Sequence, residues 1–200
     1  MIERHNKNAW EFIAAMPDKS IQAIITDPMF DDVMNMDELR RVCSGHIIMF
    51  CAEGKPFFTP DKYAYWVKPI STKNYSKNLG NFVEWIIIEK HGDTFNPDLY
   101  WANYTAVYHD VLLKKQVHPF EKPISLLERL ISIYTNPNDV VFDPFMGSGS
   151  TLKAANNLGR SAIGCEINES YFGLSNIACS GQLAGVGNAD GLSQPSANCH

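Results

Sequence analysis

Apolar and polar residues follow one another along the chain in blocks that predict strands and helices in turn. Continuous apolar runs indicate strands covered on both faces, and apolar residues three or four positions apart indicate amphipathic helices. Strands are predicted at 1–5, 21–26, 46–51, 63–67, 82–89, 140–142 and 161–165. Helices are predicted at 9–16, 37–43, 123–134, 151–158 and 168–179. This alternation predicts an α/β fold with a mostly parallel sheet and helices on both faces.

Two segments lack this periodicity. Residues 91–117 contain a glycine, an Asn-Pro pair and several aromatic residues, which indicates a loop with some extended structure. Residues 180–200 are rich in Gly, Ser, Asn and Ala and contain few large apolar residues, so we expect a disordered tail. The predicted organisation is one domain, residues 1–179, followed by this tail.

The composition restricts the classes of function. A chain of 200 residues that is 45% hydrophobic and 20% charged suits one globular domain. Its formal net charge of −5 argues against nonspecific coating of nucleic acid, although a local basic face is compatible with it. No apolar run is long enough to span a bilayer, and the five cysteines lack C-x-x-C spacing. We therefore expect a soluble, cytoplasmic protein without disulfides or a metal site.

A glycine-rich turn separates the strand at 140–142 from the next helix. Gly147 and Gly149 allow the backbone to approach a ligand where a Cβ atom would clash. Glu166 follows at the end of the next strand, where nucleotide-binding folds place the acceptor for ribose hydroxyls. The third glycine of G-x-G-x-x-G and the P-loop lysine are both absent, which disfavours dinucleotides and nucleoside triphosphates. S-adenosylmethionine, an adenosine ligand without a pyrophosphate, fits this pattern; the alternative is a tight structural turn.

Four segments, in this order, resemble the motifs of DNA amino-methyltransferases. The segments are D-P-M-F at 27–30, H-P-F-E-K-P at 118–123, D-P-F-M-G-S-G-S-T at 143–151, and I-G-C-E-I-N at 163–168 with Tyr171. The family patterns are D-P-P-Y/F, H-P-x-x-K-P, D-P-F-x-G-S-G-T-T and I-G-x-E-x-N-x-x-Y. The catalytic motif precedes the cofactor loop, which is the permuted order of the β class. The resemblance covers residues 1 to about 178 and implies a Rossmann-like, S-adenosylmethionine-dependent methyltransferase fold.

The resemblance implies roles for the first motif. An exocyclic amino nitrogen is a poor nucleophile because its lone pair is delocalised into the base. The Asp27 carboxylate and the Pro28 carbonyl would accept its hydrogens and aim the lone pair at the sulfonium methyl, for direct in-line transfer. Phe30 would stack on the flipped base. Taken alone, the same residues also fit a capped turn with a core aromatic. Met29 replaces the second proline, so the loop loses a fixed φ and activity could be weakened or lost.

The resemblance also implies the cofactor site. S-adenosylmethionine would be bound by Asp143, Phe145, Gly147, Ser148, Gly149, Ser150, Glu166 and Lys122. Within this set, Glu166 would accept hydrogen bonds from the ribose and Lys122 would face the cofactor. A solvated lysine at the start of a helix is the alternative for Lys122.

The function that the resemblance implies is methylation of the 6-amino group of adenine in DNA, because Asp in the first motif leans towards adenine. The alternatives are the 4-amino group of cytosine, a partner subunit that binds the cofactor without activity, and methylation of RNA or of protein glutamine. Restriction-modification and epigenetic marking are both compatible roles. Residues 91–117, where the β class carries its target-recognition region, are too few for an independent module. Specific DNA recognition then requires a second copy, a separate recognition subunit or a very short site read by a few loops, and we expect a homodimer.

Overall fold

The computed structural model describes residues 1–29, 33–52, 55–68, 83–92, 107–109 and 121–179. Its strands are β1 (Ile2–His5), β2 (Ile21–Thr26), β3 (Cys43–Cys51), β4 (Lys62–Val67), β5 (Val83–Lys90), β6 (Val107–Tyr108), β7 (Val140–Asp143) and β8 (Ser161–Cys165). Its helices are α1 (Ala9–Ala14), α2 (Met36–Val42), α4 (Ile124–Tyr134), α5 (Ser150–Asn157) and α6 (Glu169–Cys179).

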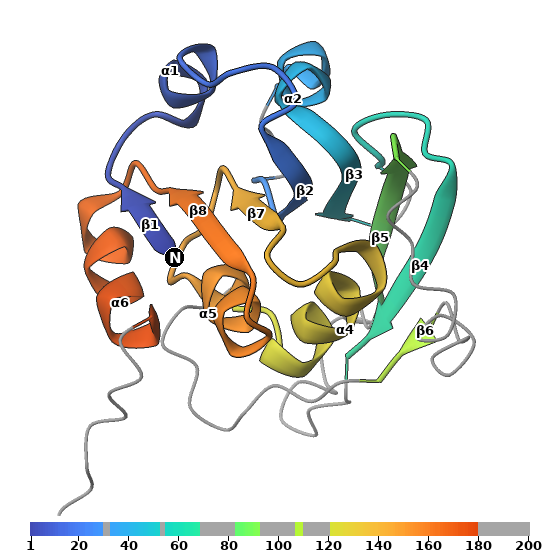
Figure 1. Cartoon of the computed structure of the whole chain (residues 1–200). Coiled ribbons are helices and arrows are strands. Elements are labelled where there is room, and N and C mark those ends of the chain that lie inside the picture. Colours follow the sequence, from blue (N-terminus) through green and yellow to red (C-terminus); the bar gives the residue numbers. More distant parts are fainter. Residues whose placement is uncertain (30–32, 53–54, 69–82, 93–106, 110–120, 180–200) are drawn as a thin grey trace, which may run out of the picture.

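The described strands form one sheet in the order β1-β8-β7-β2-β3-β5-β4-β6. Neighbouring strands run parallel except where β5 lies between β3 and β4, to both of which it is antiparallel. Helices α1 and α2 lie on one face of the sheet, and α4, α5 and α6 lie on the other (Figure 1). The predicted α/β fold with a mostly parallel sheet is therefore confirmed.

The apolar sequence of β2 matches its position in the centre of the sheet. Ile24 and Ile25 are both fully buried, and they point into different cores. Ile25 packs in the core that includes Leu127 of α4, and Ile24 packs in the core that includes Leu39 of α2. A strand buried on both faces needs apolar residues at successive positions, which is why this run lacks the alternation of a half-exposed strand.

The observed element boundaries differ slightly from those predicted. The strand predicted to start at 46 begins at Cys43, because the helix before it ends there and Cys43 already has an extended backbone, with φ −88° and ψ 127°. The first helix ends at Ala14, before the predicted end at 16. Most of 91–117, apart from 91–92 and 107–109, and all of the predicted tail at 180–200 lie outside the described residues.

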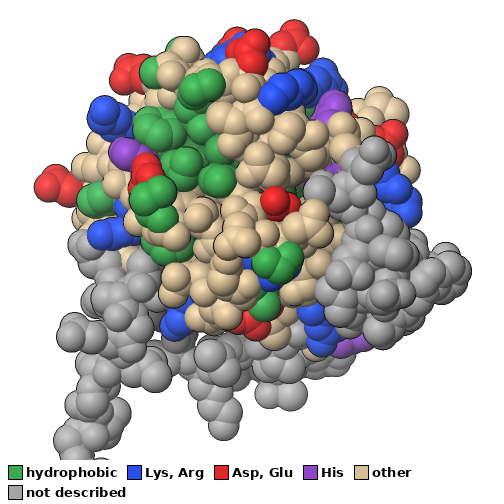
Figure 2. Space-filling model, viewed as in Figure 1, with side chains coloured by type: hydrophobic (Ala, Val, Ile, Leu, Met, Phe, Trp, Pro, Cys, Tyr) green, Lys and Arg blue, Asp and Glu red, His purple; other side chains and the backbone are tan. Residues whose placement is uncertain are grey.

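Charged side chains of both signs occur together on one face of the molecule. On the face shown in Figure 2, Lys and Arg are interspersed with Asp and Glu, and the described side chains form no broad surface of one sign. Among the described residues, no helix is long and apolar enough to cross a membrane, and no group of His, Cys, Asp and Glu is arranged to hold a metal ion.

Candidate active site

A pocket of about 540 Å³ lies at the carboxyl ends of the parallel strands. Its walls come from the segments that follow β1, β2, β7 and β8, together with Lys122 before α4 and Glu84 on β5. From β7 the chain moves outward to β8, whereas from β2 it moves in the opposite direction to β3. Open α/β sheets bind their ligands at such a switch point, outside the carboxyl ends of the strands.

Asp143 fixes the turn that follows β7 to the end of β2. Its Oδ1 accepts hydrogen bonds from the Thr26 hydroxyl at 2.7 Å and from the Phe145 backbone N–H at 3.1 Å. The carboxyl group is buried. Burial raises its pKa to about 6, although hydrogen bonds from Thr26 and Thr151 act in the opposite direction. This buried carboxyl therefore determines where the turn lies relative to the neighbouring strand.

The raised pKa of Asp143 predicts a pH dependence of stability. Since the folded protein binds the proton more tightly than an unfolded chain with a pKa near 3.8, the stabilisation is complete below that value and is lost as pH rises through about 6. Asp143→Asn lacks this titration. We expect wild type to lose stability relative to Asp143→Asn between about pH 4 and pH 6, measured by urea unfolding across pH. A difference between the two proteins that is constant over this range would contradict the prediction.

The glycines of the turn adopt conformations that side chains disfavour. Gly147 has φ 51° and Gly149 has φ 84°, both in the left-handed region, and Gly149 is the N-cap of α5. The turn therefore presents backbone N–H groups beside the start of a helix. One of them, the N–H of Gly147, donates to Oε2 of Glu166 at 3.0 Å.

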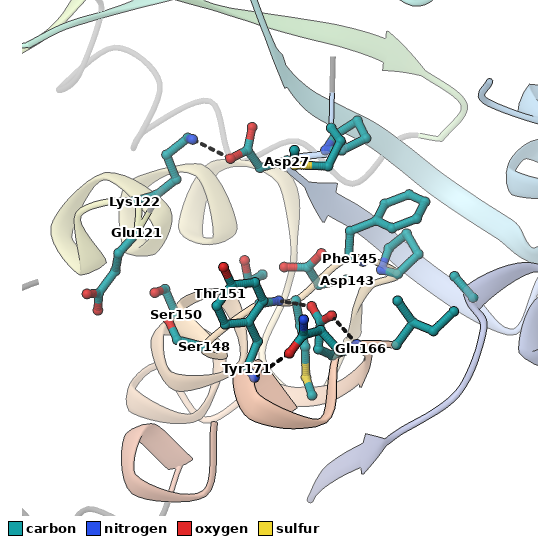
Figure 3. A pocket seen from close by; sticks show the side chains of 18 of the residues that line it. Asp27, Glu121, Lys122, Asp143, Phe145, Ser148, Ser150, Thr151, Glu166 and Tyr171 are labelled. Carbon is teal, nitrogen blue, oxygen red and sulfur yellow. Dashed lines mark hydrogen bonds and ion pairs between the residues drawn. The ribbon is translucent and has the colours of Figure 1, made fainter. Parts of the chain in front are cut away.

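Glu166 joins the end of β8 to this turn. Besides Gly147, the backbone N–H of Asn168 donates to its Oε1 at 2.7 Å, and the side chain lines the pocket (Figure 3). Each carboxylate oxygen has two lone pairs, so both can accept a further hydrogen bond. Glu166 is thus held in place by backbone donors while it keeps acceptor capacity for a ligand.

Asp27 and Lys122 meet at the opposite side of the pocket, as Figure 3 shows. The Lys122 ammonium is in direct contact with Oδ2 of Asp27, and it lies 3.2 Å from Oε2 of Glu84. Burial raises the pKa of the Asp27 carboxyl, and the Lys122 charge opposes this shift. Two carboxylates thus share one ammonium at the mouth of β2.

The structure brings most of the predicted site residues together. The pocket is lined by Asp27, Pro28, Lys122, Asp143, Phe145, Gly147, Ser148, Ser150 and Glu166. Gly149 does not line it but begins the helix behind it. Phe30 lies outside the described residues, and Met29 before it is 62% exposed. These positions do not test the binding roles, which stay predictions.

Trp10 and Glu84 are among the pocket residues that were not predicted. Trp10, at the start of α1, contacts Phe145 edge to face with ring centroids 5.9 Å apart. Glu84 lies on β5 and is paired with Lys122. The available signal for Glu84 was an acidic residue directly before the apolar run 85–88 of its strand. Nothing in the local sequence distinguished Trp10 from the core residues of its helix.

Comparisons with known proteins identify relatives of this chain. The model of a DNA methylase family, N6/N4 methyltransferases, matches residues 14–176. The chain is 32% identical to the Type II methyltransferase M.BglII of Bacillus subtilis over 126 residues, which are 62% of this chain and 34% of that protein. It is 24% identical to the Type II methyltransferase M.HpaI of Haemophilus parainfluenzae, with coverage of 92% and 76%. The chain spans between 24% and 34% of the length of M.BglII and of two further curated relatives.

Solved structures show the same fold. The structure of the M1.HpyAVI–SAM complex matches with a TM-score of 0.67 and 27% identity, covering 88% of this chain and 98% of that one. The PvuII DNA methyltransferase, described as cytosine-N4-specific, matches with a TM-score of 0.74 over 88% of this chain and 86% of that one. At 15% identity, this second likeness concerns the fold alone.

Proposed function

This chain belongs to the N6/N4 DNA methylase family, and from that membership we propose that it transfers a methyl group from S-adenosylmethionine to the 6-amino group of adenine in DNA. The observation that carries the proposal is the placement of Asp27 and Pro28 in the same pocket as Gly147 and Glu166. Two acceptors suited to an amino group thus share one space with a turn suited to an adenosine ligand.

The pocket supports S-adenosylmethionine as the cofactor. Its volume of about 540 Å³ falls within the usual range for small-molecule sites. Glu166 offers acceptors to the ribose hydroxyls, and the rings of Trp10 and Phe145 offer an apolar wall to the adenine. The family relative M1.HpyAVI is described as a complex with SAM. We therefore assign the cofactor to the side of the pocket formed by β7 and β8.

Asp27 and Pro28 supply the acceptors for catalysis. When bound, S-adenosylmethionine provides an electrophilic methyl group on a sulfonium. The Asp27 carboxylate and the Pro28 carbonyl hold the two amino hydrogens, so that the nitrogen lone pair points at that methyl. With the cofactor bound, the nitrogen would gain positive charge as it accepts the methyl group, the electrons of the S–C bond would remain on sulfur, and the nearby Asp27 carboxylate would stabilise the charge. The nitrogen then loses one proton, and Asp27 is the adjacent acceptor.

The target base is the finer part of the proposal. Asp27 in the first motif position favours adenine, as the family resemblance implies. Cytosine is the second candidate, since the matching family model covers both N6 and N4 methylases. The deciding experiment incubates the protein with labelled cofactor and DNA, RNA or protein, and then separates the modified units. Label in N6-methyladenine supports the proposal. Label in N4-methylcytosine, in RNA or in glutamine would instead identify that group as the substrate. Absence of label in all three substrates refutes the proposal.

We also propose that residues 1–179 form a single methyltransferase domain that recognises DNA as a homodimer. The chain carries a net charge of −5, and basic side chains on the face in Figure 2 are interspersed with acidic ones. The release of counterions that drives most DNA affinity should therefore be small for one copy. The segment 91–117, where the β class carries its target-recognition region, is short and lies mostly outside the described residues.

Sedimentation combined with DNA titration across salt concentration tests this assembly. We expect binding to appear together with dimers, because two copies double the basic surface available to the phosphates. The matched control is the same titration at protein concentrations below the dimer dissociation constant. A strictly monomeric protein that binds one sequence at nanomolar affinity in physiological salt would refute the homodimer.

A further inference from the structure

Four charged side chains form a continuous row that leads to the mouth of β2. In order, this charge row consists of Lys68, Glu84, Lys122 and Asp27. Lys68 contacts Oε1 of Glu84, and Lys122 lies between Oε2 of Glu84 and Oδ2 of Asp27. Side-chain exposure along the row is 32%, 14%, 8% and 24%. Positive and negative groups alternate, so the row is neutral as a whole.

Lys122 is the most buried member of the row. Its ammonium lies 5.1 Å from the ring centroid of Phe50 and 5.9 Å from that of Trp66. Ring faces attract a cation but accept no strong hydrogen bond, so the two carboxylates are its charged partners within contact distance. An ammonium this deeply buried requires such partners, because transfer out of water is costly for an unpaired charge.

The surroundings of Asp27 determine its protonation. Glu84 from β5 and Asp143 from β7 are acidic groups coupled to it, and Glu121 lines the same pocket. Cys51 from β3 is kept neutral, since burial raises the pKa of its thiol to about 11. Lys122 is the cation in direct contact with Asp27, and Lys68 acts from farther along the row. Burial and the acidic neighbours thus favour a protonated Asp27, and Lys122 opposes them.

We propose that Lys122 is a positioning residue that keeps the Asp27 carboxylate ionised and oriented, and that Glu84 shares Lys122 so that Asp27 can turn to the amino group of the target base. This inference rests on the proposed function, in which Asp27 accepts the amino hydrogens. A protonated carboxyl would offer one of its oxygens as a donor and would lose that role. When the base engages Asp27, the ammonium keeps its contact with Glu84 and is not left without a charged partner.

The test is the pH dependence of methyl transfer at saturating cofactor in two variants with opposite expected shifts. Lys122→Met removes the cation beside Asp27, so the acidic limb of the kcat profile should move to higher pH. Glu84→Gln removes an anion and leaves Lys122 to Asp27, so the same limb should move to lower pH. Lys122→Arg keeps the positive charge, so the acidic limb of its kcat profile should lie closer to that of the wild type than the limb of Lys122→Met does. The matched control is Glu89→Gln, which changes another carboxylate of β5, paired with Arg40, and should leave the limb in place.

A second readout separates this inference from the proposed function. Carbon-detected NMR of the side-chain carboxyls, with the Asp27 signal assigned from Asp27→Asn, follows the titration of Asp27 without any methyl transfer. Opposite displacements in Lys122→Met and Glu84→Gln support the inference even if the wild type modifies no DNA, an outcome that would count against the proposed function alone. Unchanged titration in both folded variants, or displacement in the same direction, overturns the inference, whatever the activity. If Lys122→Met does not fold, Lys122→Arg and Glu84→Gln still decide it.

Discussion

Replacing Asp27 with alanine is expected to lower the rate of methyl transfer by a factor on the order of 10²–10³, the typical cost of removing one positioned partner from a transition state. Affinity for S-adenosylmethionine should stay within a few-fold of wild type, because Asp27 lies on the β2 side of the pocket and Glu166 on the β8 side. The variant should also fold, since Lys122 keeps its contact with Glu84. Single-turnover transfer and calorimetry of cofactor binding measure the two effects separately.

Two further variants make this result specific. Asp27→Asn retains one oxygen acceptor at the same place and should lose less activity than alanine. Asp37→Ala removes an exposed carboxylate in the first turn of α2 and should transfer methyl at the wild-type rate. If folded Asp27→Ala were as fast as wild type, Asp27 would not be the acceptor for the amino group, and the proposed mechanism would be wrong.

Glu166→Ala is expected to weaken S-adenosylmethionine binding by about 10- to 100-fold, the range for losing a hydrogen bond to a charged group. The loss has two sources. The ribose hydroxyls lose their acceptor, and the backbone N–H groups of Gly147 and Asn168 lose the carboxylate that now positions the turn. Calorimetry with the cofactor alone measures the effect without any DNA.

The control for Glu166→Ala is a variant of Glu169, three residues further along the chain. Glu169 is an exposed acidic residue in the first turn of α6, so Glu169→Ala changes the same charge without touching the pocket. Its cofactor affinity should equal that of wild type. Equal affinity in a folded Glu166→Ala protein would instead remove Glu166 from the cofactor site and leave it as a structural tie of the turn.

The side of the pocket to which we assign the cofactor could be predicted because its information is local. The apolar run of β7, the glycines of the turn and Glu166 after β8 all fall between residues 140 and 166. Positive φ at Gly147 and Gly149 is a requirement that a sequence expresses directly through the absence of a side chain. The same holds for β2, whose largely apolar run indicated burial on both faces.

The charge row could not be predicted because it depends on register between distant segments. Lys122 and Asp27 are 95 positions apart in the sequence. Glu84 is brought to Lys122 by the antiparallel pairing of β5 with β3. A shift of one residue in β5 would turn Glu84 to the opposite face and Trp85 toward Lys122. The motif predicted that Lys122 faces the cofactor, whereas the partners of its ammonium were visible only in the structure.

The position of β2 between β3 and β7 has a consequence for synthesis on the ribosome. One neighbour, β3, emerges soon after β2, but β7 begins 114 positions after Thr26. At typical rates of translation, the edge of β2 that pairs with β7 therefore stays unpaired for on the order of ten seconds. During that interval β2 offers unpaired N–H and C=O groups to any other nascent strand. The order of motifs along this chain thus leaves one edge of β2 open to aggregation while the protein is still being synthesised.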